Sequence, residues 1–287
     1  MPLDVKAGTV VAFERNGGIF VATYPVLSRA RRIGQGQDVS ISSDGSRVAY
    51  EETPSGPTRH CVVRDVRTGR VLLKTNGAFP FLSPDGRTLA YGGFQNSDWH
   101  LRTTPVENTT SASYLNPLSE AISFVCRARK NDLSYPIGWV GNRLMTYSSD
   151  FDGGVSVVES GKVIRFIPYR KITGGRNISI PFFGGFSKDL NQVVFEAETG
   201  KEGPEGYPET GVYATDLQAG KTRRLPNPPK QEVSHPAWYQ DFATFTAYRS
   251  NAKQAAPAVC LMNIQTGETR VIVANADRAV FAAGTGV

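Results

Sequence analysis

The sequence predicts an all-β protein, a six-bladed β-propeller in which each blade is a sheet of four antiparallel strands. Two repeated motifs and one apolar strand without a neighbour at the C-terminal end predict this fold. Glycine and proline, 29 and 18 of the 287 residues, recur between short apolar runs, which is typical of an all-β chain rich in turns. The repeats recur at the period of a propeller blade, which favours this fold over other all-β folds.

The first motif is a tight Asp-Gly turn that leads into an apolar strand ending in an aromatic residue. It occurs at 42–50 and 83–91, and Asp44 and Asp85 lie 41 positions apart, which is one blade period. An Asp-Gly turn joins two antiparallel strands, and the closing tyrosine is expected to pack between layers. Weaker copies occupy 141–147, 187–195 and 239–245.

The second motif lies downstream in the same repeats. It is a strand, a polar turn closed by glycine, and another strand, and it occurs at 61–73, 212–222 and 259–269. In all three copies an Asp or Asn and a Gly stand at fixed offsets, as a conserved turn geometry would require. The two motifs together predict four strands in each unit, named A to D from the first to the last.

The first motif resembles the WD40-like, or PD40, repeat of TolB-like propellers. That repeat has an apolar residue, then Ser-Pro-Asp-Gly, then an apolar strand ending in an aromatic residue. Residues 83–86 match it fully, whereas Ser42-Ser43-Asp44-Gly45 lacks the proline. The resemblance covers nearly the whole chain and implies an architecture. No segment matches the α/β domain that precedes the TolB propeller, so the resemblance does not imply the role of TolB.

The repeats predict a ring that the C-terminal strand closes. The units are expected at 8–36, 38–76, 79–118, 137–168, 181–226 and 235–273. The first contains only three strands, at 10–13, 19–22 and 31–33, and a spare apolar strand follows the sixth unit at 279–283. We predict that this strand becomes the innermost strand of the first blade and removes the open sheet edges. Residues 1–287 would then form one domain, and a monomer is expected because a closed ring has no edge to pair.

Loop lengths predict which face of the ring binds a ligand. The A–B and C–D turns lie on one face, here called the tight-turn face, and the B–C and D–A connections lie on the other, here called the long-loop face. The long connections belong to the second set, at 53–60, 104–136, 169–181, 200–211 and 249–258. Long loops on a rigid scaffold tend to carry binding residues. The long-loop face is therefore the predicted working face.

The predicted partner-binding residues are aromatic, basic or histidine side chains on or near the long-loop face. They are Trp99, His100, Arg129, Tyr135, Tyr169, Arg170, Lys171, Arg176, Tyr207 and His235. Exposed aromatic residues beside arginine suit a protein or a sugar partner. The alternative for each residue is an ordinary structural one, with the rings packed between blades and the charges solvated.

The sequence does not predict a catalytic or metal site. It contains no Gly-x-Ser-x-Gly elbow, and its histidines, His60, His100 and His235, fall in three different units, where convergence on a metal is less expected than structural roles. Its three cysteines, Cys61, Cys126 and Cys260, show no CxxC spacing and are expected to be buried free thiols. No cofactor is expected.

The charge pattern bears on the partner and the compartment. The net charge is +6 with a pI of about 9.2, which would suit an acidic partner. The basic residues are scattered rather than clustered, so nucleic acid is not the expected partner. The chain shows no leader pattern and no apolar run of about 18 residues. It is expected to be cytoplasmic, or else an exported chain whose signal has been removed.

These observations favour a non-catalytic scaffold that binds a protein partner on its long-loop face, with an inhibitor or immunity role as one form. The first alternative is a carbohydrate-active propeller, a lyase or glycosidase with paired carboxylates in the axial funnel. The candidates for such a pair are Glu51, Glu52, Asp98, Glu196 and Glu198. The second alternative is lectin-like sugar binding on an aromatic platform such as Trp99 or Trp238.

Overall fold

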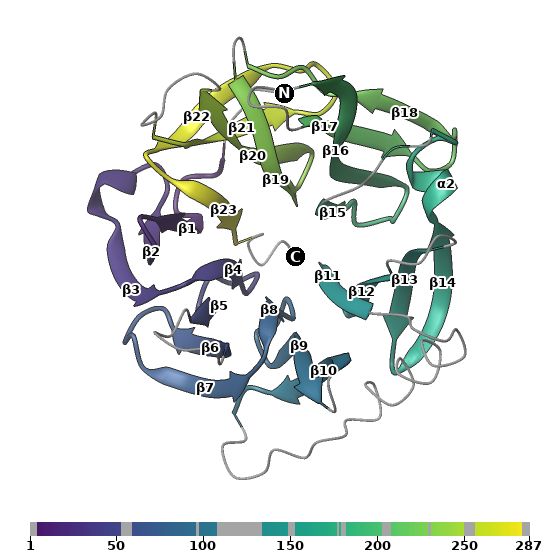
Figure 1. Cartoon of the computed structure of the whole chain (residues 1–287). Coiled ribbons are helices and arrows are strands. Elements are labelled where there is room, and N and C mark those ends of the chain that lie inside the picture. Colours follow the sequence, from purple (N-terminus) through teal and green to yellow (C-terminus); the bar gives the residue numbers. More distant parts are fainter. Residues whose placement is uncertain are drawn as a thin grey trace.

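A computed structural model of the chain shows six antiparallel β-sheets arranged as blades around a central axis (Figure 1). The residues that it describes are 5–52, 59–95, 98–107, 134–148, 153–176, 178, 182–202, 208–228, 231–249 and 256–282. The all-β, six-bladed propeller expected from the repeats is confirmed.

Each blade begins with its innermost strand at the axis and ends with its outermost strand at the rim (Figure 1). Blade 1 contains β23 (Asp277–Phe281), β1 (Val10–Arg15), β2 (Gly18–Thr23) and β3 (Arg31–Gln35). Blade 2 contains β4 (Gln37–Ile41), β5 (Arg47–Glu52), β6 (His60–Asp65) and β7 (Val71–Asn76). Blade 3 contains β8 (Ala78–Leu82), β9 (Thr88–Gln95) and β10 (Asp98–Pro105). The fourth strand expected for blade 3 lies outside the described residues.

The other three blades are four-stranded. Blade 4 contains β11 (Ser134–Val140), β12 (Arg143–Ser148), β13 (Gly154–Glu159) and β14 (Lys162–Pro168). Blade 5 contains β15 (Phe182–Phe186), β16 (Gln192–Glu202), β17 (Pro208–Asp216) and β18 (Lys221–Arg224). Blade 6 contains β19 (Gln231–Tyr239), β20 (Phe242–Arg249), β21 (Ala258–Asn263) and β22 (Thr269–Ala274). The described helical segments are the short η1 (Leu27–Arg29) and α2 (Tyr169–Ile172), and neither is long enough to cross a membrane.

The C-terminal strand closes the ring as predicted. β23 pairs antiparallel with β1, with Val280 opposite Ala12, and the Ala282 N–H donates to the Val10 carbonyl at 2.9 Å. Phe281 and Ala282 are buried in the first blade. The two ends of the chain therefore share one sheet, and β23 completes blade 1 as its fourth strand.

The aromatic residues near the ends of the B strands form much of the core between blades. Tyr50, Phe195 and Phe245 are fully buried, and Tyr91 is nearly so. Each contributes to a hydrophobic cluster that joins neighbouring blades. The packing role predicted for the first motif is thus confirmed, and the core consists of a wedge between each pair of blades rather than one central mass.

The A–B turns owe their shape to a Ser-x-Asp hydrogen-bond pattern. In blade 2 the Ser42 hydroxyl donates to Asp44 Oδ1 at 2.6 Å, and the Arg47 N–H donates back to Ser42 Oγ at 3.0 Å. Blade 5 repeats this pattern with Ser187 and Asp189. The hydrogen bond from Ser187 and those from Asn191 lower the pKa of Asp189. The turn geometry therefore survives where the sequence motif has largely decayed.

The C–D turns share a second pattern. Asp65, Asp216 and Asn263 each accept hydrogen bonds from the turn that follows them; Asn263 Oδ1, for example, accepts from the N–H groups of Gln265 and Thr266 at 2.8 and 3.0 Å. The invariable Asp or Asn of the second motif is thus an acceptor that closes the turn.

Arginines on the tight-turn face hold neighbouring blades together. Arg47 donates to the carbonyl of Gly86 in the next blade at 2.9 Å, and Arg143 donates to that of Lys188 at 2.9 Å. Arg31 and Arg223 make the same kind of contact, with Val66 and Ile264 respectively. These four arginines therefore have a role inside the fold, so the net positive charge is a weaker guide to the partner than the sequence suggested.

Two of the cysteines behave as expected. Cys61 and Cys260 are buried free thiols in β6 and β21. Burial raises the pKa of both, to about 11 for Cys260, which keeps them as unreactive thiols at neutral pH. Cys126 lies outside the described residues.

Candidate functional site

The innermost strands line an axial channel with two chambers. The wide chamber has a volume of about 1290 Å³ and opens among the A–B and C–D turns of the tight-turn face. The narrow chamber has a volume of about 400 Å³ and lies at the beginnings of the A strands, on the long-loop face. The two share six lining residues, one from each blade: Val280, Val39, Phe81, Ile137, Gly184 and Ala237.

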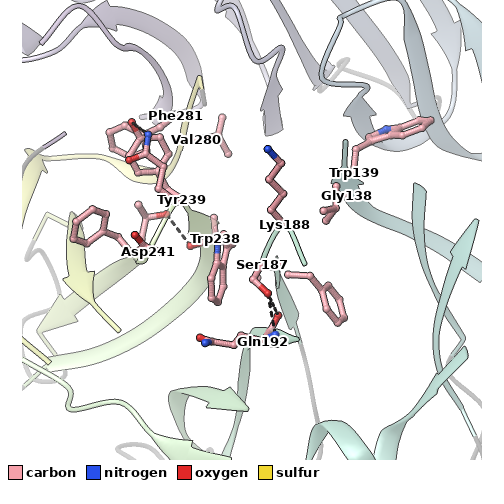
Figure 2. A pocket seen from close by; sticks show the side chains of 18 of the residues that line it. Gly138, Trp139, Ser187, Lys188, Gln192, Trp238, Tyr239, Asp241, Val280 and Phe281 are labelled. Carbon is pink, nitrogen blue, oxygen red and sulfur yellow. Dashed lines mark hydrogen bonds between the residues drawn. The ribbon is translucent and has the colours of Figure 1, made fainter. Parts of the chain in front are cut away.

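The wide chamber is lined by turn residues and by two tryptophans. Figure 2 shows Lys188 projecting into it between the segments that carry Trp139 and Trp238. Trp139 Nε1 donates to the Phe81 carbonyl at 3.2 Å, which fixes this ring against blade 3. Asp241 also lines this chamber and is exposed. Sequence reasoning placed Trp238 among the sugar-platform candidates but did not predict a large opening on the tight-turn face.

The narrow chamber is lined by four residues in an unusual backbone conformation. Asp38, Phe79, His235 and Arg278 have φ angles of 57°, 56°, 51° and 38°. They stand at corresponding bulges of the innermost strands, near the starts of β4, β8 and β23 and in the middle of β19. A left-handed conformation costs a non-glycine residue about 1–2 kcal/mol, so four in one chamber wall require support from the surrounding structure.

Side chains from the B strands supply that support. Glu196 Oε2 in β16 accepts from the His235 N–H at 2.9 Å, and Thr246 Oγ1 in β20 accepts from the Arg278 N–H at 3.0 Å. Glu51 Oε2 in β5 likewise accepts from the Phe79 N–H at 3.4 Å. In each case a B-strand acceptor in one blade holds the bulged residue of the next blade.

Glu14 provides the fourth such contact, and its Oε1 accepts from the Val39 N–H at 3.3 Å. Burial raises the pKa of Glu14 to about 7, although the Arg278 charge and the Val39 hydrogen bond partly oppose this. Sequence reasoning missed Glu14. A signal was available, because Glu14 directly follows the aromatic residue of its B strand, as Glu51 and Glu196 do in their blades.

These contacts bear on the carboxylates proposed for glycosidic chemistry. Glu51 and Glu196 are both buried and occupied as backbone acceptors. Glu52 forms an ion pair with Lys74 on the blade surface. Glu198 lies further along β16, and the side chain of Asp98 is outside the described residues. Among these described carboxylates, therefore, Glu51 and Glu196 support the residues that line the chamber and do not line it themselves.

A hydrogen-bonded network surrounds His235. Its Nδ1 lies 3.3 Å from Asp277 Oδ1, which also accepts from the Thr246 hydroxyl at 2.8 Å. The Tyr248 hydroxyl lies 3.3 Å from both Asp277 oxygens. Burial by itself would lower the pKa of His235, but the hydrogen bond and charge of Asp277 outweigh it and raise that pKa. The charged form of His235 is thus more favoured than in a free histidine, and the hydrogen bond and charge of His235 help to lower the pKa of Asp277.

Aromatic rings from blades 3 to 5 form the opposite wall of the narrow chamber. Phe79 and Tyr135 meet edge to face with centroids 5.4 Å apart, and Tyr147 lies 5.1 Å from Phe183. Tyr169 packs behind this pair, 5.5 Å from Tyr147. The chamber therefore has an aromatic wall on blades 3 to 5 and a charged wall on blades 6, 1 and 2.

The structure brings only some of the predicted residues to this site. Tyr135 and His235 line the narrow chamber, and Tyr169 supports its aromatic wall from behind. Arg170 and Lys171 are exposed on α2 rather than in an extended loop, and Arg176 follows it at the surface, where its guanidinium approaches the Thr222 carbonyl at 3.4 Å.

The remaining predictions are not placed. Trp99 and His100 lie in β10, but their side chains are outside the described residues, as are Arg129 and Tyr207 entirely. β10 continues to Pro105, so the long loop predicted at 104–136 does not begin at 104. Within the described ranges, no group of three or more His, Cys, Asp or Glu side chains is arranged to hold a metal ion.

Sequence reasoning also missed Asp38, Phe79, Tyr147, Phe183 and Arg278, which complete the chamber. Each belongs to a strand, whereas the sequence-based prediction favoured residues on or near the long loops. A shared signal exists for two of the four bulged residues, because Phe79 and His235 each immediately precede a proline.

Comparison with known proteins identifies the fold only. No protein-family model matches the chain, and no curated protein matches it. Among solved structures, TolB from Acinetobacter baumannii superposes with a TM-score of 0.59 at 13% identity, over 96% of this chain and 66% of that one. This chain thus spans slightly less than two thirds of that protein.

Other structures with the same fold come from different settings. A TolB from Agrobacterium tumefaciens, described as putative, gives a TM-score of 0.54 at 13% identity, covering 94% of this chain and 90% of that one. A chain from a nidogen/laminin complex gives 0.59 at 11% identity, covering 96% and 100%. Prolyl endopeptidases share the fold over half of their length, with a TM-score of 0.52 at 12% identity over 96% of this chain. Together with the strand order, these likenesses show that the chain has the six-bladed β-propeller fold that these structures, TolB among them, share.

Proposed function

We propose that this propeller is a non-catalytic scaffold that binds a protein partner on its long-loop face, with the narrow chamber as the anchor point. One observation carries the proposal. Four bulged residues in the left-handed conformation converge on that chamber. In each bulge a backbone N–H, that of the left-handed residue itself or that of Val39 after Asp38, donates to a side chain of the preceding blade. Non-glycine residues held in this strained conformation cluster at binding and catalytic sites, where the surrounding structure keeps them in place.

The shape and lining of the chamber support the same conclusion. Its volume of about 400 Å³ falls in the range of binding pockets, and its lining is mainly apolar with a few convergent polar groups. Tyrosine and arginine, the residue types that dominate binding hot spots, both line it. The fold also occurs in a protein–protein complex, the nidogen/laminin structure.

Site-specific photocrosslinking tests the proposal. A photoreactive amino acid replaces Tyr135 in the narrow chamber or, as a matched control, Trp139 in the wide chamber, and the full chain is irradiated in its native cell. We expect a discrete crosslinked protein from position 135 that is absent from position 139. Crosslinks from position 139 alone, or none from either position in correctly folded protein, would overturn the proposal.

The wide chamber supports a second candidate function, sugar binding. Trp139 and Trp238 line it from blades 4 and 6, with Lys188 between them (Figure 2), and flat apolar rings paired with polar groups suit a saccharide. A glycan array probed with wild type and with Trp238→Leu tests this candidate. Glycan binding that the substitution abolishes would support it, and an array without binders would refute it.

A further inference from the structure

This inference rests on the proposed function and concerns the chemistry of the partner. We propose that the narrow chamber receives a basic side chain, arginine or lysine, from the partner protein. The stem of that side chain lies against the aromatic wall, and its cationic end faces the carboxylates of the charged wall.

The balance of charge around the chamber supports a cationic occupant. The charged groups that line it, or that contact its lining, comprise five carboxylates and three bases: Glu14, Asp38, Glu51, Glu196 and Asp277, against Arg59, His235 and Arg278. Three pairs form, Arg278 with Asp38, Arg59 with Glu51 and His235 with Asp277. Among the described residues, Glu14 and Glu196 form no ion pair of their own, and ionisation of either one makes the site negative even when His235 is protonated. Burial raises the pKa of both, to about 7 for Glu14.

Burial raises the pKa of Glu14, Glu51 and Glu196, but it also strengthens the field of each one that is ionised. Glu196 is only 6% exposed, and the side chain of Glu51 only 2%. Charges with little water around them are screened much less than surface charges. A cation entering the chamber would therefore be stabilised, whereas a carboxylate or phosphate would be repelled.

The aromatic wall supports the same occupant. Phe79, Tyr135, Tyr147 and Phe183 surround one side of the cavity. An ammonium or guanidinium within about 6 Å of a ring centroid is attracted to the ring face, and the methylene stem of the same side chain gains apolar contact. A purely apolar side chain would satisfy this wall but leave the charged wall desolvated. A lysine or arginine satisfies both.

This local charge differs in sign from that of the whole chain. The net charge of +6 favours an acidic partner, but at least four arginines are occupied in contacts between blades on the opposite face. Local groups decide what enters a pocket, because the Debye length at physiological salt is about 8 Å. A partner with a basic residue in an otherwise acidic or neutral segment is compatible with both charges.

A displayed library of random peptides tests the proposal. The immobilised full chain selects peptides, and each enriched peptide is then assayed on the double variant Tyr135→Leu, Asp277→Asn. We expect enrichment of arginine or lysine at one fixed position among peptides that the double variant fails to bind. Enriched peptides that depend on the chamber but contain no basic residue would overturn the inference and leave the proposed function standing. If no enriched peptide depends on the chamber, both fail.

Titration of one selected peptide makes the test quantitative. Replacing its arginine with citrulline, or its lysine with norleucine, keeps the shape but removes the charge and should weaken binding about tenfold or more. Tyr135→Leu and Asp277→Asn should each weaken it about threefold or more, whereas Asp241→Asn, the same kind of change in the wide chamber, should have no effect. Binding of the neutral peptide within twofold of the original would refute the cationic role.

Folding is checked by circular dichroism and thermal melting of every variant. If Tyr135→Leu or Asp277→Asn does not fold, Phe183→Leu replaces it, since this substitution keeps an apolar side chain and removes an aromatic face. The selected peptides must then bind the Phe183→Leu variant about threefold more weakly than wild type. Equal affinities would overturn the inference.

Discussion

Glu196 of blade 5 accepts a hydrogen bond from the backbone N–H of His235 in blade 6 at 2.9 Å. The acceptor is buried in the β16 strand, and the donor belongs to a residue with a φ of 51°. The contact therefore fixes both the angle between two blades and the position of a chamber residue. Three equivalent contacts occur around the ring, so stability and site geometry share the same bonds.

Replacing Glu196 with leucine should destabilise the fold by about 1–3 kcal/mol, because it leaves the His235 N–H buried and without an acceptor. Glu196→Gln retains an acceptor oxygen and should lie close to wild type. Equilibrium unfolding in urea measures both free energies. Equal stability of the leucine and glutamine variants would show that the hydrogen bond is not needed.

Glu14 should make the stability of the protein depend on pH. Its pKa is 4.5 in an unfolded chain and about 7 in the folded one, so the folded state binds more protons between these values. The free energy of unfolding contributed by this group is therefore greatest below about pH 4.5 and falls as the pH rises to about 7. The loss is at most about 3 kcal/mol.

Glu14→Gln serves as the matched variant, because its amide oxygen can still accept from Val39 but does not ionise. Denaturant unfolding between pH 5 and pH 8 should show wild type losing stability relative to this variant as the pH rises. Parallel curves for the two proteins would show that Glu14 titrates normally.

Removal of residues 277–287 should destabilise the entire ring. The deletion eliminates β23 and exposes the cluster that contains Phe281 and Ala279, which costs about 3–5 kcal/mol for the phenylalanine alone. The melting temperature should fall by roughly 10 °C or more. Removal of 284–287 spares β23 and is the control. If the protein without residues 277–287 melted at the same temperature as the full-length chain, closure of the ring by this strand would be disproved.

Cys61 and Cys260 should resist thiol reagents in the folded protein. Both are buried, and burial raises the pKa of each thiol, so little thiolate forms at pH 8. In a Cys126→Ser background, Ellman's reagent should detect almost no thiol before denaturation and both afterwards. Rapid labelling of the native variant would contradict the burial of these strands.

The sequence was sufficient to predict the fold because the turns and strands of each blade are determined by residues close together in the sequence. The Asp44 and Asp85 turns, the apolar B strands and the Asn263-type turns act within a few residues of one another, so their spacing reveals the repeat. Closure by β23 was predictable for a related reason. The first repeat lacks a strand, and one apolar segment after the sixth repeat remained to fill its place.

The site was less predictable because it depends on contacts between blades. His235 and Tyr135 were found by residue type, but Arg278 and Glu14 come together only when the two ends of the chain meet. The bulge that turns Asp38 and Phe79 into the channel leaves little mark in the sequence: Phe79 precedes a proline, but Asp38 does not. Long loops were a natural place to search, whereas the chamber is built mainly by the first residues of strands.

Ring closure by β23 has a consequence for biosynthesis. The strand that completes the first blade also carries Asp277 and Arg278, two residues of the charged wall. During synthesis β1 to β22 precede β23, so the aromatic wall of blades 3 to 5 can form before the charged wall is complete. If the proposed function is correct, the chamber can bind only after β23 has joined blade 1.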